Sequence, residues 1–153
     1  MNPIYLRRMA RHDLSLQETP RTHKELIRCL FGSQSHPLRQ AMALQDRASF
    51  INQENCGSLN SQKGFSCEEL LYGLDASLSL SRGGFAQSPR HVKQILEGLA
   101  LTRKRPNKSE SSQGYSVCHI GVGSGWTTAL LLELGCSVDL YNSHPYALTN
   151  ISK

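Results

Sequence analysis

Residues 115–126 read YSVCHIGVGSGW, an apolar run followed by three glycines at alternate positions. This order predicts a short strand that ends at Ile120, then a glycine-rich turn, then a helix. Glycine lacks a Cβ atom and adopts positive φ angles readily, so such a turn can approach a ligand closely. A helix that begins directly after the turn offers backbone N–H groups to a nucleotide-like cofactor at the carboxyl end of a parallel sheet.

The residues after the turn extend this motif into a β-α-β unit. Residues 127–134 form the expected helix and Gly135 ends it, while residues 137–141 alternate as a second strand. A crossover of this kind makes the two strands parallel neighbours. We predict an α/β fold in which residues 115–153 begin a Rossmann-like cofactor-binding domain. Its sheet is expected to be incomplete, because few residues follow the motif, and a last helix is expected near Pro145.

Residues 22–101 carry helical patterns and predict a helical N-terminal region. Thr22 and Glu25 fit a capping box for a first helix that ends near Phe31. A second helix begins near Pro37, because proline is favoured in a first turn. The buried side of the second helix is expected to comprise Leu38, Ala41, Met42 and Ala48.

A third helix begins with Ser88 as N-cap and Pro89 as its first residue. Its apolar stripe is predicted to consist of Val92, Ile95, Leu96 and Leu99. Residues 70–81 show no clear period and are expected to be irregular. The remaining segments are predicted as an N-terminal arm at residues 1–21, a loop at residues 52–64 and a polar linker at residues 102–114.

The bulk composition excludes several classes of protein. The chain has 153 residues, enough for one ordinary domain, and a net charge of +5. The chain has a basic cluster at residues 103–105, which we interpret as part of a solvated loop and not as a contact with nucleic acid. No apolar run approaches the roughly 20 residues that span a bilayer, so we expect no membrane contact and a cytoplasmic location. Five cysteines without a C-x-x-C pair argue against a disulfide framework or a zinc site, and Cys118 is predicted as a small core residue.

Several single residues near the motifs have two interpretations. Ser88 is a helix N-cap first and a catalytic hydroxyl second. His119 is either a hydrogen-bonded polar residue beside a cofactor pocket or a replacement that damages the pocket. Asn142 follows the second strand and can hydrogen-bond a ribose hydroxyl, although less strongly than a carboxylate does. The six histidines show no metal-ligand spacing, so no metal is predicted.

Five segments follow one another in the order found in a single enzyme family. Residues 38–50, LRQAMALQDRASF, match an early helix that ends in an Asp-Arg-Ala-x-Phe signature. Residues 71–80 match an Ala-Tyr, Asp and Pro-Leu segment whose prolines are lost, and residues 83–92 fall at a Thr-Ile-Ser-x-Pro stretch. Residues 119–126 match a glycine-rich cofactor loop, and residues 138–148 match the strand and helix start that follow it.

The chain therefore resembles the protein-L-isoaspartate O-methyltransferase family over roughly residues 22–153. The resemblance implies a Rossmann-like S-adenosylmethionine-dependent methyltransferase that methylates the carboxylate of L-isoaspartyl residues in damaged proteins, which begins their repair. It implies that Gln87 and Ser88 face the substrate. The implied partners are isoaspartyl peptides or proteins. Because the sheet is expected to be incomplete, a subunit that completes it is a further candidate partner. The implied cofactor contacts are His119, Gly121, Gly123, Ser124, Gly125 and Asn142.

Three positions depart from the family pattern. Its active-site serine falls at Gln87, its acid before the first glycine at His119, and its ribose-binding glutamate at Asn142. A second hypothesis is therefore a non-catalytic or partner-completed remnant of the same fold that acts as an interaction module. A third, a methyltransferase that binds nucleic acid, rests on the basic charge alone and ranks last.

Overall fold

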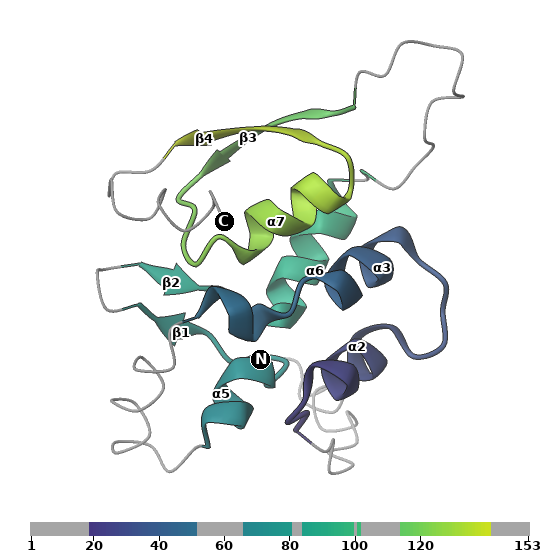
Figure 1. The fold of residues 1–153 in the computed structure, drawn as a ribbon, viewed down its shortest axis with the longest axis vertical. Coiled ribbons are helices and arrows are strands. Elements are labelled where there is room, and N and C mark those ends of the chain that lie inside the picture. The colour runs from purple at the N-terminus through teal and green to yellow at the C-terminus, as the bar shows by residue number, and fades with distance from the viewer. Residues whose placement is uncertain (1–18, 52–65, 81–83, 100, 102–113, 142–153) are drawn as a thin grey trace, which may run out of the picture.

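The computed structural model describes residues 19–51, 66–80, 84–99, 101 and 114–141. These residues form an α/β structure with five α-helices, one 3-10 helix and two two-stranded sheets (Figure 1). Some expectations lie outside the described ranges: the arm at residues 1–18, the loop at 52–64, the linker at 102–113, the helix near Pro145 and the contact of Asn142.

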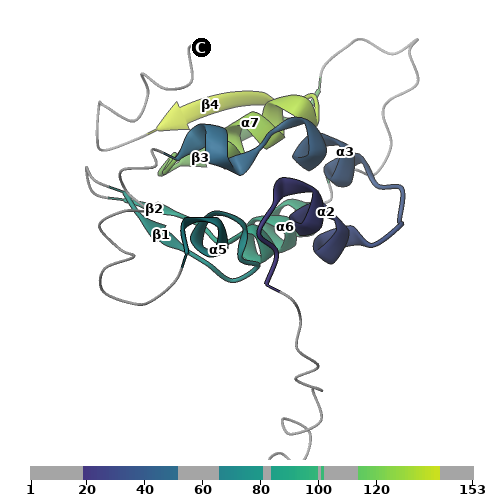
Figure 2. The same cartoon turned by 60° about the horizontal axis from the view of Figure 1, so that its bottom comes forward.

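The predicted parallel β-α-β unit is confirmed. Strands β3 (Ser116–Ile120) and β4 (Ser137–Tyr141) pair in parallel, with the two last residues opposite each other. Helix α7 (Trp126–Glu133) connects the strands and covers one face of the pair, and α3 (Pro37–Leu44) packs beneath α7 (Figure 2). Within the described residues this sheet has two strands, so it is small and incomplete.

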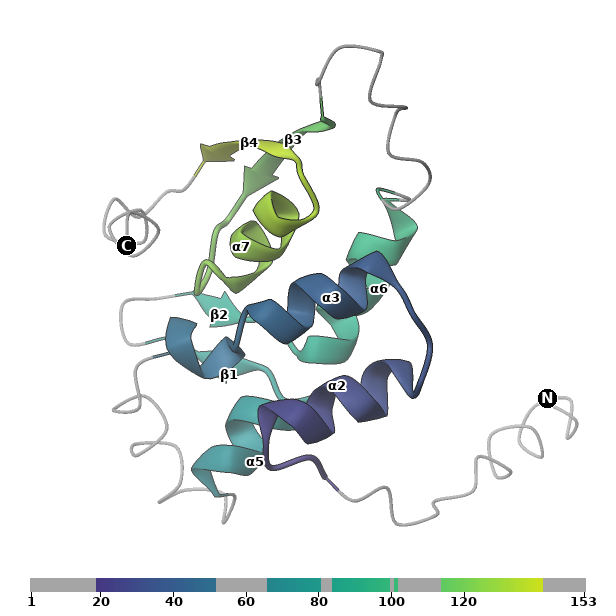
Figure 3. The ribbon, with the colours of Figure 1, turned by 45° about the vertical axis from the view of Figure 1, so that its right-hand side comes forward.

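Helix α2 (His23–Phe31) and α3 form an antiparallel hairpin (Figure 3). The hydroxyl of Thr22 accepts a hydrogen bond from the Glu25 amide, as the capping box predicts. The Glu25 carboxylate accepts from the Arg21 amide instead of the Thr22 amide, so the reciprocal bond is displaced by one residue. Gly32, at a φ of 58°, ends α2 near the predicted position.

Helix α3 is shorter than predicted. It ends at Leu44, and a 3-10 helix, η1 (Arg47–Phe50), follows it. The Asp46 carboxylate accepts a hydrogen bond from the Ala48 amide and caps this new turn, because a short acidic side chain competes with the helical backbone bonds. Ala48 therefore lies half-buried in η1 and not on the buried face of α3, where Leu38, Ala41 and Met42 are buried as predicted.

A helix that the sequence analysis missed precedes a short β-hairpin. Helix α5 (Cys67–Tyr72) begins with a complete capping box, in which Ser66 and Glu69 each bind the other's amide through their side chains. Strand β1 (Leu78–Ser79) then pairs antiparallel with β2 (Phe85–Ala86). The segment that was expected to be irregular is therefore partly regular.

Helix α6 (Pro89–Gly98) begins at the predicted cap, where the Ser88 hydroxyl accepts a hydrogen bond from the His91 amide. Its predicted apolar stripe was too wide. Within the stripe, one pair at i, i+4 spacing faces the core, because residues at this spacing lie one above the other on a helix. The buried members of the stripe are Val92 and Leu96, and the exposed members are Ile95 and Leu99.

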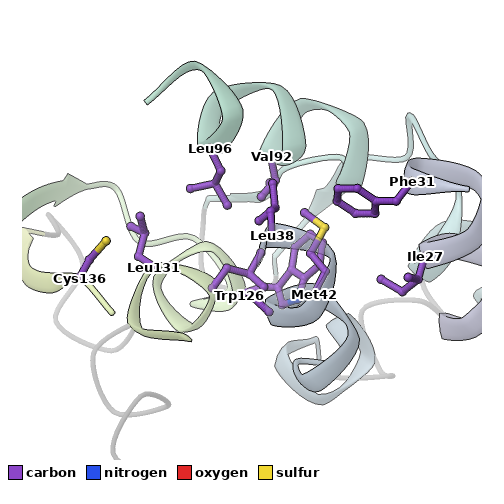
Figure 4. Close-up of a cluster of buried hydrophobic side chains, with 11 residues drawn as sticks. Ile27, Phe31, Leu38, Met42, Val92, Leu96, Trp126, Leu131 and Cys136 are labelled. Carbon is purple, nitrogen blue, oxygen red and sulfur yellow. The ribbon is translucent and has the colours of Figure 1, made fainter. Parts of the chain in front are cut away.

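The helical region and the β-α-β unit share one hydrophobic core (Figure 4). In it, Trp126 of α7 lies beside Leu38 and Met42 of α3. The buried members are Ile27, Phe31, Leu38, Ala41, Met42, Val92, Leu96, Trp126, Leu130, Leu131 and Cys136. A second, smaller cluster of Ile51, Leu71, Leu78 and Ala86 lies under α5 and the β1–β2 hairpin.

The guanidinium of Arg47 joins these parts of the molecule. Arg47 is fully buried, and its two terminal nitrogens donate to backbone carbonyls from three places in the chain. The carbonyls belong to Leu70 and Leu71 in α5, Ala76 in the next turn, and Ala86 and Gln87 at β2. The guanidinium carbon also lies 5.9 Å from the centre of the Trp126 ring, a cation–π distance.

Replacing Arg47 with methionine is expected to destabilise the fold by about 3 kcal/mol or more, because several buried carbonyls lose a charged donor. The free energy of unfolding in urea, followed by far-ultraviolet circular dichroism, measures this cost. The matched control is Arg90→Met, which removes an arginine that is paired with Asp75 at the surface and should cost under about 1 kcal/mol. Equal costs for the two variants would contradict the role assigned to Arg47.

Candidate functional site

The loop between β3 and α7, residues 121–125, takes a conformation that glycine permits, and we call it the glycine loop. The Gly121 amide donates to the carbonyl of Tyr141 at 2.9 Å, which ties the start of the loop to the end of β4. Residues other than glycine rarely adopt the left-handed region. All three glycines of the loop occupy it, with φ of 77° at Gly121, 57° at Gly123 and 88° at Gly125.

Part of the glycine loop offers free backbone donors. The Gly125 amide is used within the loop, where it donates to the Val122 carbonyl at 3.0 Å. The Ser124 hydroxyl accepts a hydrogen bond from the amide of Trp126, the first residue of α7, at 3.4 Å. Within the described part of the chain, the backbone amides of Val122, Gly123 and Ser124 donate no hydrogen bond. Free amides ahead of a helix are suited to an anionic or polar ligand group.

Strand β2 lies directly against the glycine loop (Figure 1). A Cβ atom on Gly123 would come within 2.5 Å of the Phe85 carbonyl oxygen, so only glycine allows this approach. On the other side of the loop, a Cβ atom on Gly121 would meet nothing within 4 Å. β2 therefore covers the loop at Gly123, while the loop is open at Gly121.

The two residues that were predicted to face a substrate lie in the segment that leads away from this contact. Gln87 and Ser88 follow β2 directly. The side chain of Gln87 is exposed, while its backbone carbonyl accepts a hydrogen bond from Arg47. Ser88 is buried, and its hydroxyl accepts from the His91 amide as an N-cap. Of the two, Gln87 is the one with a side chain free to meet a ligand in solution.

His119 faces α7 and not the open side of the glycine loop. Its Nδ1 atom lies 2.9 Å from the hydroxyl of Thr128, which is buried in α7. Burial lowers the pKa of His119 below its ordinary value of 6.5, because desolvation disfavours the charged ring. Of the two interpretations of this residue, the geometry fits a hydrogen-bonded structural histidine.

Trp126 holds the glycine loop on the helical region, a role that the sequence analysis did not assign. Its indole Nε1 donates to the Gln45 carbonyl at the end of α3, at 2.8 Å. The Gln45 side chain in turn donates to Glu133 at the far end of α7, at 2.7 Å. A single tryptophan directly after the last glycine was the available signal, because a buried indole needs a partner for its N–H.

The face of the β3–β4 sheet opposite α7 is exposed within the described residues. Ile120 is 77% exposed and Tyr141 is 61% exposed at the carboxyl ends of the two strands. Cys118 lies on the same face, so its prediction as a core residue was wrong. Alternation along a strand puts every second residue on each face, and only the face that carries Val117 and His119 meets α7.

Comparisons with known proteins give no further support for a family. No family model, no curated protein and no solved structure matches the chain. None of the described helices is long and apolar enough to cross a bilayer. The described residues also contain no cluster of His, Cys, Asp or Glu side chains placed to bind a metal ion.

Gly123→Ala is expected to cost about 1–3 kcal/mol more than Gly121→Ala in the free energy of unfolding. Both substitutions place a side chain at positive φ, but only the first forces a Cβ atom against the Phe85 carbonyl. Urea unfolding of the two variants measures the difference. If both variants lose the same stability, β2 does not lie against the glycine loop.

The pH dependence of stability tests the placement of His119. The pKa of His119 is lower in the folded protein than its ordinary value of 6.5. The neutral ring therefore contributes its full share of the free energy of unfolding above pH 6.5, and this share is lost as the pH falls below that value. Nuclear magnetic resonance titration of the His119 ring is expected to give a midpoint below 6.5. His119→Gln should reduce the loss of stability that occurs as the pH falls below 6.5. A midpoint at or above 6.5 would contradict burial of the ring against Thr128.

Proposed function

We propose that this chain binds S-adenosylmethionine at the glycine loop and transfers its methyl group to the carboxylate of an isoaspartyl residue in a peptide. One observation carries the proposal: the free amides of the glycine loop and the exposed side chain of Gln87 belong to segments held together by the contact of Gly123 with Phe85. Sequence segments that resemble one methyltransferase family thereby meet in space.

The donor set of the loop fits the polar part of such a cofactor. The free amides of Val122, Gly123 and Ser124 would receive a carboxylate or hydroxyl oxygen, at the end of β3 where nucleosides bind in parallel sheets. The open side at Gly121 leaves room for a ligand to come close to the backbone. Asn142, which belongs to the proposed cofactor contacts, lies outside the described residues.

The reaction asks the protein mainly for positioning. When bound, S-adenosylmethionine would supply an electrophilic sulfonium methyl group for transfer to a carboxylate oxygen. A carboxylate is already deprotonated at neutral pH, so no general base is required. The side-chain amide of Gln87 would hold the carboxylate by hydrogen bonds, and the Ser88 cap would fix that segment on α6.

A second candidate function is a non-catalytic interaction module on the same fold. Its support is the exposed face of the β3–β4 sheet, with Ile120 and Tyr141 uncovered within the described residues, and the orientation of His119 toward α7. An exposed sheet face of this kind is suited to a subunit that packs over it. In that case the glycine loop is an inherited turn that no longer retains a ligand.

Isothermal titration with S-adenosylmethionine tests the proposal, and micromolar affinity is the expected result. Gly121→Ala should weaken binding about tenfold or more, because its Cβ atom would occupy the open side of the loop. Gly135→Ala is the matched control, since it has the same positive φ and open surroundings at the opposite end of α7. Equal affinity in both variants would show that the ligand does not lie on the glycine loop.

A methyl-transfer assay on an isoaspartyl peptide separates the two candidate functions. The enzyme hypothesis predicts turnover that falls on substitution of Gln87 with alanine, while cofactor affinity stays unchanged. The interaction-module hypothesis predicts no turnover at any peptide concentration. Equal turnover with and without the Gln87 substitution would exclude this residue from the proposed site and would still support the proposed reaction.

A further inference from the structure

A cavity of about 660 Å³ lies between α2 and α3, away from the glycine loop, and has no role in the function proposed above. Ile27 and Ala43 contribute apolar surface to it. Its rim carries three basic side chains, Lys24 and Arg28 from α2 and Arg39 from α3. We call this cavity the α2–α3 groove, after the two helices that line it.

The three basic side chains of the α2–α3 groove have no carboxylate partner among the described residues. The Nε atom of Arg39 is buried and makes no hydrogen bond within the described part of the chain. A buried donor of this kind is costly unless something binds it. The one acidic residue of the lining, Glu25, has its carboxylate engaged by the Arg21 amide.

Helix stability accounts for only part of this arrangement. Lys24 lies in the first turn of α2, where the helix dipole disfavours a positive charge. Arg28 lies in the last turn, where a positive charge is favoured, and lines the same groove. Helix α2 is nine residues long, so the groove runs over roughly 13 Å, enough for about four residues of extended chain.

We propose that the α2–α3 groove binds an acidic peptide segment, with carboxylates on the three basic side chains and apolar side chains on Ile27 and Ala43. Charge complementarity favours an acidic partner, and the apolar floor and the length favour a peptide over a single small anion. The groove acts independently of the glycine loop, because the lining residues all belong to α2, α3 and the turns that flank α2.

Fluorescence anisotropy with a labelled peptide that alternates Glu and Leu tests the proposal without any cofactor. The peptide should bind the whole chain at low salt and lose affinity at about 0.15 M ionic strength, while the matched Gln–Leu peptide should not bind. Inorganic phosphate should displace the peptide no better than chloride at equal ionic strength. Binding of the neutral peptide, specific displacement by phosphate, or no binding at all would overturn the proposal.

Three variants locate the peptide on the molecule. Arg39→Gln should weaken binding about tenfold or more, since it removes a partly buried charged donor. Lys24→Gln, at an exposed position that the fold tolerates, should weaken it about two- to fivefold. Arg90→Gln on α6 makes the same change of charge outside the groove and should leave affinity unchanged. Equal affinity of the Lys24 and Arg90 variants would overturn the proposal even if the Arg39 variant fails to fold.

Discussion

A single buried guanidinium organises the region around the candidate site. Arg47 has no exposed surface, so its charge must be satisfied by protein groups, and backbone carbonyls from α5, the following turn and β2 supply them. Because these carbonyls come from separate segments, they can meet the fork of donors only when the segments are correctly placed. The cation–π contact with Trp126 then links this polar centre to the main hydrophobic core.

The candidate site depends indirectly on the buried guanidinium of Arg47. Arg47 holds the carbonyl of Gln87, and Trp126 holds the helix that begins at the end of the glycine loop. The two segments meet where the Phe85 carbonyl approaches Gly123 so closely that no side chain fits. The methyl transfer that we propose would require such rigid support, since that reaction gains little from acid–base chemistry and much from the distance and angle between reactants.

Local signals predicted much of the secondary structure. The caps at Thr22 and Ser88, the strands on either side of the glycine loop and the turn at Gly135 all follow from residues within a few positions of each other. The errors also have local causes. Helix α5 was missed although its capping box begins at Ser66, and α3 was made too long because Asp46 was not considered as a competing cap.

The sequence by itself determined the parallel β-α-β unit and the glycine turn, because period, capping and glycine spacing act over a single turn or strand. Only the tertiary structure decided that Arg47 is buried, that β2 closes one side of the glycine loop, and that the basic residues of α2 and α3 gather on one groove. These features join positions far apart in the chain, such as Trp126 and Gln45 at 81 residues' separation. Contacts of that range depend on how whole elements pack, and no local pattern in the chain encodes them.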